Sequence, residues 1–260
     1  MITLCCLWDS AYHKNGLALL ASLRQHNPDF RLFVLALDAH VYAELDGQAN
    51  VEAFYLPTVE DDAMLEAKAN RTHIEYAWTL ASVFTYWVVD VFNPPSLAYM
   101  DSDCYLFNSL ASLYDEVRDA QVAITPHRWT PSQADRLRGA GIYNVGWTYF
   151  ARGDGYKCLR EWRDKCLKWC YHRVEADGRF ADQGYLNDWP QRWGAHVVKH
   201  LGANLAPWNQ EQYIYNGLTV SDGKRTDQIL FYHFHGGLDT GYVLNPGVRG
   251  LYNEYAGRMG

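Results

Sequence analysis

The chain has no apolar run that approaches the roughly 18 residues needed to cross a membrane as a helix. Its opening, residues 1–8, has no basic leader and is followed by Asp9, so we interpret it as a strand rather than a secretory signal. The six cysteines are scattered and lack the paired C-x-x-C spacing, a pattern typical of reduced thiols. We therefore expect a cytoplasmic protein without a membrane span.

Positive charge is also scarce, with 23 Lys and Arg against 30 Asp and Glu and a net charge of −7. No basic surface for nucleic acid or an anionic membrane is expected, and both are excluded as direct partners. We find no repeat, low-complexity segment or linker, so one domain over residues 1–260 is predicted. Hydrophobic residues make up 48% of the chain, which argues against disorder.

Apolar runs of strand length alternate with amphipathic segments of helix length. Residues 2–7 and 31–38 read as strands around a helix that contains residues 17–23, a βαβ unit that favours a parallel sheet. Further strands are expected at residues 51–55, 97–101, 121–124, 142–150 and 229–235, and helices at residues 60–68, 75–91, 110–117, 158–175 and from 180 onward. The fold class is therefore α/β, a Rossmann-like, mostly parallel mixed sheet flanked by helices, whose ligands bind at the carboxyl ends of strands.

Two carboxylates, Asp101 and Asp103, stand where the apolar run 97–100 is interrupted. Residues two apart in a strand face the same way, so both could reach one hard cation such as Mg²⁺ or Mn²⁺. An Asx turn at a strand end is the alternative explanation.

Other candidates carry structural alternatives of the same kind. Asp9 and Asp38 follow the first two strands and could be helix caps or turn residues, and Asp182 could cap the helix that follows it. Asn144 alone could be structural. His233 and His235 would face the same side of a strand, which makes a third metal ligand credible.

Taken together, five segments resemble the GT-A nucleotide-sugar glycosyltransferases, especially the family 8 retaining enzymes and glycogenin. They span most of the chain in the order found in that family: the opening from Thr3 through Asp9 and Tyr12 to Arg24, Tyr99-Met100-Asp101-Ser102-Asp103 (the DxD motif), Tyr143-Asn144-Val145-Gly146, Asp182-Gln183-Gly184-x-Leu186-Asn187, and His233-Phe234-x-Gly236.

The resemblance implies transfer of a sugar from a nucleotide-diphosphate sugar, such as a UDP-sugar, to a glycan or other hydroxyl acceptor, with retention, as in polysaccharide biosynthesis. It implies that Asp101, Asp103 and His233 hold Mn²⁺ or Mg²⁺, with His233 rather than His235 in the motif's position. Asp182 and Gln183 would approach the reacting sugar as catalytic residues. The residues assigned to the nucleotide sugar are Leu7, Asp9, Tyr12, Asp38, Arg71, Asp101, Ser102, Asn144, Gly146 and Gly236.

The sequence departs from that family where a diphosphate-binding Lys is expected, because no base follows Gly236 and Gly237. Either the cation carries more of the diphosphate binding or an arginine compensates; the candidates are Arg71, Arg136, Arg138 and Arg249. Two other functions stay open. A sugar nucleotidyltransferase would need a basic, Gly-rich first loop, whereas residues 7–16 contain only Lys14; a non-catalytic nucleotide-sugar or glycan-binding protein of the same fold would keep the cleft without turnover.

Overall fold

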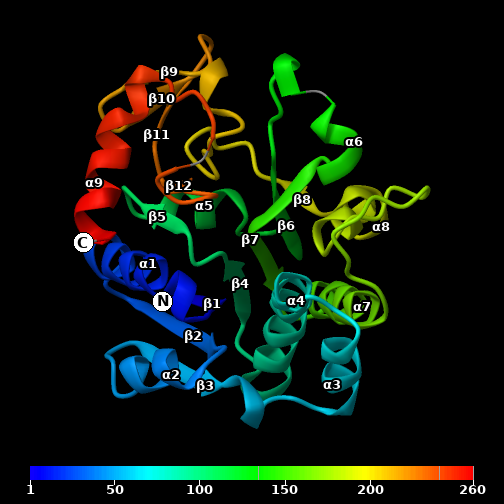
Figure 1. The fold of residues 1–260 in the computed structure, drawn as a ribbon. Helices are drawn as coiled ribbons and strands as arrows, with labels where there is room; N and C mark the ends of the chain where they lie inside the picture. The colour runs from blue at the N-terminus through cyan, green and yellow to red at the C-terminus, as the bar shows by residue number, and fades with distance from the viewer. Residues whose placement is uncertain (134, 240, 260) are drawn as a thin grey trace.

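A mixed, mostly parallel sheet forms the centre of the protein (Figure 1). The structure is a computed structural model that describes residues 1–133, 135–239 and 241–259, apart from the side chain of Arg138. The seven strands of the sheet lie in the order β3-β2-β1-β4-β7-β6-β8. They are β1 (Ile2–Trp8), β2 (Phe30–Ala36), β3 (Val51–Tyr55), β4 (Ser96–Met100), β6 (Val122–Pro126), β7 (Tyr143–Ala151) and β8 (His196–Val197).

Parallel pairing joins β3, β2, β1 and β4, and β7 runs antiparallel between β4 and β6. The expected fold class, an α/β protein with a mostly parallel mixed sheet, is thereby confirmed. The carboxyl ends of the four parallel strands meet at one edge of the sheet, so the segments that follow them are brought together.

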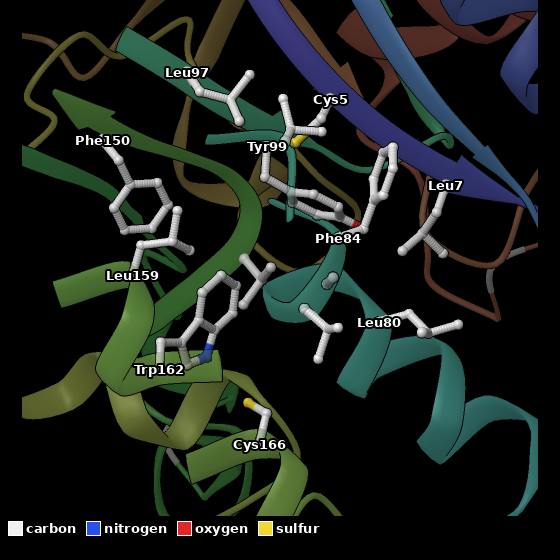
Figure 2. Close-up of a cluster of buried hydrophobic side chains, with 14 of the residues drawn as sticks. Cys5, Leu7, Leu80, Phe84, Leu97, Tyr99, Phe150, Leu159, Trp162 and Cys166 are labelled. Carbon is white, nitrogen blue, oxygen red and sulfur yellow. The ribbon is translucent and has the colours of Figure 1, made fainter. Parts of the chain in front are cut away.

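Helices cover both faces of this sheet. They are α1 (His13–His26), α2 (Ala39–Leu45), α3 (Asp62–Ala69), α4 (His73–Phe92), α5 (Ala111–Glu116), α6 (Arg136–Ala140), α7 (Asp154–Lys168), α8 (Trp189–Arg192) and α9 (Arg249–Met259). The alternation of β1 divides the core between the two faces: Cys5 and Leu7 pack with α4 and α7, whereas Cys6 and Trp8 pack with α1. Figure 2 shows the first of these clusters, with Phe84 of α4 and Trp162 of α7 turned toward the strands.

The long helix α4 delivers the chain to the central strand β4. It begins with a capping box in which Thr72 and Glu75 bond each other's backbone N–H, and it ends at Asn93 in the left-handed conformation. Pro94 and Pro95 follow and prevent the helix from continuing. The chain then enters β4, which ends at Met100, one residue before the candidate carboxylates.

A small antiparallel sheet stands beyond that end of β4. It pairs β5 (Cys104–Leu106) with β12 (Phe231–His233), so that Cys104 lies opposite His233. Segments 101–103 and 233–235, far apart in sequence, therefore leave this pair at the same end. The helix α9 packs against these strands in a third cluster that includes Tyr105, Tyr232 and Tyr255. A separate three-stranded sheet, which the sequence did not predict, is formed by β9 (Ile214–Asn216), β10 (Thr219–Ser221) and β11 (Thr226–Gln228).

Three expected elements differ from those observed. The helix expected to reach residue 175 ends at Lys168, because Trp169 takes an extended backbone conformation (φ −154°, ψ 119°) and its ring is covered by the guanidinium groups of Arg173 and Arg179. The segment after Asp182 is a 3-10 helix, η4 (Gln183–Asp188), rather than an α-helix. The last expected strand ends at His233, so His235 lies outside it.

Among the residues that the structure describes, no helix combines the length and apolar composition of a membrane span.

Candidate functional site

The two carboxylates and one histidine meet just beyond the end of β4. Asp103 Oδ1 lies 3.0 Å from His233 Nε2, and Asp101 Oδ2 lies 3.8 Å from the same nitrogen. The other oxygen of Asp101 accepts a hydrogen bond from the Tyr99 hydroxyl at 2.8 Å. The backbone supports this placement, since Phe234 N donates to Asp103 O. Three residues that were predicted as metal ligands are therefore neighbours in space.

Asn144 on β7 fixes the orientation of the His233 ring. Its Oδ1 accepts from His233 Nδ1 at 3.2 Å and from Gly146 N at 2.9 Å. A hydrogen bond at Nδ1 leaves Nε2 facing the carboxylates, the usual arrangement of a metal-binding imidazole. Gly146 is needed at this point: a Cβ there would lie 2.5 Å from Asn144 Oδ1 and 2.6 Å from His233 Nδ1.

His235 lies beside this cluster. Asp103, His233 and His235 each present a ligand atom, and these atoms all lie within 4.8 Å of one another. The buried Trp208 ring meets both imidazoles edge to face, with centroid distances of 5.2 Å to His233 and 5.6 Å to His235. The sequence placed His235 outside the metal set, whereas the structure makes it available.

The donor set suits a divalent cation. Carboxylate oxygens with imidazole nitrogen match Mn²⁺ and its first-row neighbours better than Ca²⁺, which takes oxygen ligands throughout. A further observation marks the surroundings as polar and incomplete. Asn204 is fully buried in the left-handed conformation (φ 58°), its amide has no hydrogen-bond partner, and its Oδ1 lies 3.0 Å from the Cβ position at Gly146. The residues present therefore fit the expected cation.

Charges within the cluster shift one another's protonation. Burial raises the pKa of Asp101 to about 6, with His233 opposing the shift and the nearby Asp103 adding to it. The charge of His233 and its hydrogen bond hold the pKa of Asp103 below its usual value, despite burial. The two carboxylates in turn raise the pKa of His233 against the effect of burial. His235 is exposed along part of its side chain, but desolvation of its ring and the charge of His233 lower its pKa, which favours the neutral imidazole that a metal ligand requires.

Asp182, just before η4, is close enough to Asp101 for the charge of that carboxylate to act on it. Its side chain makes no capping hydrogen bond, so the explanation of Asp182 as a helix cap does not apply. It is 5% exposed, and burial followed by the charge of Asp101 raises its pKa to about 8. The preceding Ala181 has a φ of 47°, a left-handed conformation that is strained for a residue other than Gly. Gln183 follows and is partly exposed.

The loop after β1 lies near the cluster. Asp9 caps the 3-10 helix η1 (Ser10–Tyr12) and its second oxygen lies 2.7 Å from His73 Nε2. Asp38 caps α2 and also accepts from Ser10 N, which ties the ends of β1 and β2 together. The capping alternatives for Asp9 and Asp38 are thus realised. Burial and the charges of Asp103, Asp101 and Asp9 raise the pKa of Tyr12, which indicates that its hydroxyl lies near the cluster.

The remaining predicted residues occupy different positions. Leu7 is buried in β1, Ser102 is buried between the two carboxylates, and Gly236 begins the turn after His235. Arg71 does not contact the cluster in any bond of the described structure; it donates to Thr79 Oγ1 and to Leu167 O at the end of α7.

Of the arginines suggested as replacements for the missing Lys, Arg136 is close enough to the cluster for its charge to lower the pKa of His235. Its guanidinium donates to Tyr242 OH at 2.6 Å. Arg249 is exposed at the start of α9. The side chain of Arg138 lies outside the described part of the chain.

Sequence reasoning missed the polar and aromatic residues that support the cluster. Tyr99, His127, Asn204 and Trp208 have roles that appear only in three dimensions: Trp208 Nε1, for example, donates to His127 O across 81 residues of chain. The only sequence signal was that segments 125–128 and 204–209 are rich in side chains that form hydrogen bonds and ring contacts.

Comparison with curated proteins supplies a family. The protein named "Uncharacterized protein YfnD" from Bacillus subtilis (strain 168) is 32% identical over 227 residues, which cover 84% of this chain and 72% of YfnD. The chain belongs to the YfnD family. YfnF from the same strain, also named as an uncharacterized protein, is 28% identical over 238 residues, covering 85% of the chain and 77% of YfnF. No model of a known protein family matches the chain.

Solved structures resemble this member of the YfnD family over almost its whole length. A crystal structure of the galactosyltransferase LgtC in complex with donor and acceptor sugar analogues matches 99% of the chain and 95% of LgtC, with a TM-score of 0.61 at 16% identity. The glycosyltransferase GlyE of Streptococcus pneumoniae TIGR4 in its apo form matches 98% of the chain and 60% of GlyE (TM-score 0.59, 13% identity). Mouse xyloside xylosyltransferase 1 matches 94% and 99% (TM-score 0.54, 15% identity). The fold is thus the GT-A fold of glycosyltransferases.

Proposed function

We propose that this protein is a metal-dependent glycosyltransferase of the family 8 type, which transfers a sugar from a UDP-sugar to a hydroxyl group of a glycan with retention of anomeric configuration. One observation carries the proposal. Asp101, Asp103 and His233 lie together at the carboxyl edge of a GT-A sheet, and the buried Asp182, which does not cap the helix after it, lies near Asp101. A cation site beside a buried acid whose side chain does not cap the following helix suits transfer chemistry.

Mn²⁺ or Mg²⁺ held by Asp101, Asp103 and His233 would act as a Lewis acid that stabilises the charge on the departing diphosphate. The protein's own residues do the rest. Asn144 and Gly146 keep His233 oriented, and Arg136 supplies the positive charge that the missing Lys would give to the diphosphate. The loop from Asp9 to Tyr12, tied to Asp38, binds the nucleotide.

Asp182 and Gln183 act at the sugar. The carboxylate of Asp182 stabilises positive charge that develops on the anomeric carbon, and the Gln183 amide positions the sugar beside it. Asp182 ionises more readily when a cation neutralises Asp101, whose charge is one cause of its raised pKa. The cluster provides no separate strong base for the acceptor, so the departing phosphate takes the acceptor's proton on the same face, which gives retention.

The setting of this activity follows from the same features. We place the whole activity in one domain over residues 1–260, because the central sheet brings Asp101 and Asn144 beside His233 of the small β5–β12 sheet. All six cysteines are buried and unpaired, which suits the cytoplasm, where nucleotide sugars are used to build polysaccharides.

A donor screen tests the proposal. Purified protein with Mn²⁺ is incubated with a panel of nucleotide-diphosphate sugars, and free nucleoside diphosphate is measured with and without EDTA. Cation-dependent release from a UDP-sugar is expected. A parallel reaction with UTP and sugar 1-phosphates detects a nucleotidyltransferase through pyrophosphate release, which would refute glycosyl transfer. Donor binding by calorimetry with no release under any condition would identify a non-catalytic binding protein instead.

A further inference from the structure

A tight turn returns His235 to the cluster after its strand has ended. β12 ends at His233, and Gly236 and Gly237 follow with φ values of 78° and 71°, which favour glycine at both positions. Gly237 N donates to Phe234 O at 2.7 Å and closes the turn. As a result, the imidazole of His235 offers a nitrogen in the same 4.8 Å group as Asp103 and His233.

Trp208 restricts the orientation of both imidazoles. It is 4% exposed and anchored by the bond from its Nε1 to His127 O at 3.0 Å. The ring plane of Trp208 makes an angle of 77° with that of His233 and 67° with that of His235. The centroids of the two imidazoles are 5.9 Å apart, and their planes make an angle of 83°. Both rings therefore pack edge to face against a fixed surface, an arrangement that positions them in advance.

We propose that His235 is a further protein ligand of the cation, so that two carboxylates and two imidazoles hold it, from Asp101, Asp103, His233 and His235. The inference rests on the proposed function and deepens it, because it defines which cation the site selects. Nitrogen ligands favour the later first-row metals, whereas oxygen ligands suit Mg²⁺ and Mn²⁺. Adding a second imidazole ligand should therefore raise the ratio of Co²⁺ affinity to Mn²⁺ affinity. It should also make the site bind Mg²⁺ more weakly than either of these ions.

Cation binding in the absence of donor tests this assignment. Calorimetry gives the Kd of Co²⁺, Mn²⁺ and Mg²⁺ for the wild type, His235→Ala and His235→Asp, with His40→Ala as a control on another exposed histidine, in α2. Because His235 is exposed, its substitution leaves the core intact. We expect His235→Ala to weaken Co²⁺ binding by about tenfold or more and Mn²⁺ binding by less. His235→Asp, which returns an oxygen ligand, should restore Mn²⁺ but not Co²⁺. His40→Ala should match the wild type.

Electron spin echo spectroscopy of bound Mn²⁺ gives a direct count, because each coordinated imidazole nitrogen modulates the echo. Two nitrogens are expected in the wild type and one in His235→Ala. Equal Co²⁺ affinity in these two proteins, or one nitrogen in both, would refute the ligand assignment. If His235→Ala kept its cation affinity but lost donor affinity, His235 would belong to the diphosphate site instead.

These outcomes separate the inference from the proposed function. Weaker cation binding by His235→Ala in a protein that turns over no nucleotide sugar would support the ligand assignment and refute the transferase. Turnover in the wild type with unchanged cation binding in His235→Ala would do the reverse. Failure of the wild type to bind any divalent cation would overturn both the inference and the metal-dependent mechanism.

Discussion

The replacement Asp182→Asn should stabilise the cation-free protein at neutral pH. Asp182 is 5% exposed, makes no capping bond, and has a pKa raised to about 8 by burial and by Asp101. In the unfolded chain the same carboxyl ionises near pH 3.9. Between about pH 4 and 8 the unfolded chain has therefore lost a proton that the folded protein keeps, so the wild type loses stability as the pH rises through this window.

The size of the effect follows from the two pKa values. At pH 7 the difference between about 3.9 and about 8 corresponds to an upper limit of about 4 kcal/mol. Water reaching the cleft and relaxation of the site reduce this penalty, and we expect Asn to recover about 1–2 kcal/mol. For a chain of this size that gain raises the Tm by about 2–8 °C.

Thermal melts in EDTA from pH 4 to pH 8 measure the effect. The variant should melt above the wild type at pH 7, and the difference should shrink to a small remainder at pH 4, where folded Asp182 is protonated and the unfolded carboxyl is about half protonated. Asp188→Asn, at the other end of η4 with a 48% exposed side chain, is the matched control and should change the Tm little. A variant that is less stable than the wild type at pH 7, or a difference independent of pH, would refute this account of Asp182.

Three further predictions concern the cation and the diphosphate. Asp103→Asn removes an anionic ligand and should reduce nucleoside diphosphate release by about 10²-fold or more, as should EDTA; full activity in EDTA would contradict a metal-dependent mechanism. Gly146→Ala places a Cβ 2.5 Å from Asn144 Oδ1, which should displace the amide that orients His233. Calorimetry should therefore show Mn²⁺ affinity about 10- to 100-fold weaker. Unchanged affinity would mean that Asn144 does not help to hold the site. Arg136→Ala should raise the donor KM about tenfold, because it removes a charge-assisted contact to the diphosphate. Arg249→Ala, at an exposed position outside the cluster, is the control and should leave the KM unchanged. Equal KM values for both variants and the wild type would show that Arg136 does not replace the missing Lys.

Much of the fold was predictable because its strands are strongly apolar and its helices are bounded by clear signals. The strand Val51–Tyr55 was predicted with its exact bounds, and the order strand, helix, strand at the start of the chain specified a parallel sheet. The end of α7 was not predictable in the same way, because Trp169 leaves the helix to make tertiary contacts with arginines further along the chain. The three-stranded sheet of residues 214–228 has strands of only three residues each, too short to give a clear periodic signal.

The sequence singled out residues that the structure brings close together, but it did not reveal the side chains that support them. Asp101 and Asp103 follow a recognisable strand, and the structure places His233 beside them. The position of His235 depends on a turn through two glycines and on a Trp side chain from another segment, which a strand pattern cannot reveal. Whether Asp182 caps a helix depends on backbone angles, which the sequence does not specify.

The turnover of Asp182→Asn, once a donor is known, tests the proposed transfer most directly. Nucleoside diphosphate release and donor affinity should be measured side by side for this variant and the wild type with saturating Mn²⁺. We predict that release falls by about 10²-fold or more while the donor Kd changes much less, because the carboxylate acts mainly on the transition state. Equal release by the two proteins would contradict the account and leave the proposed transfer without its central residue.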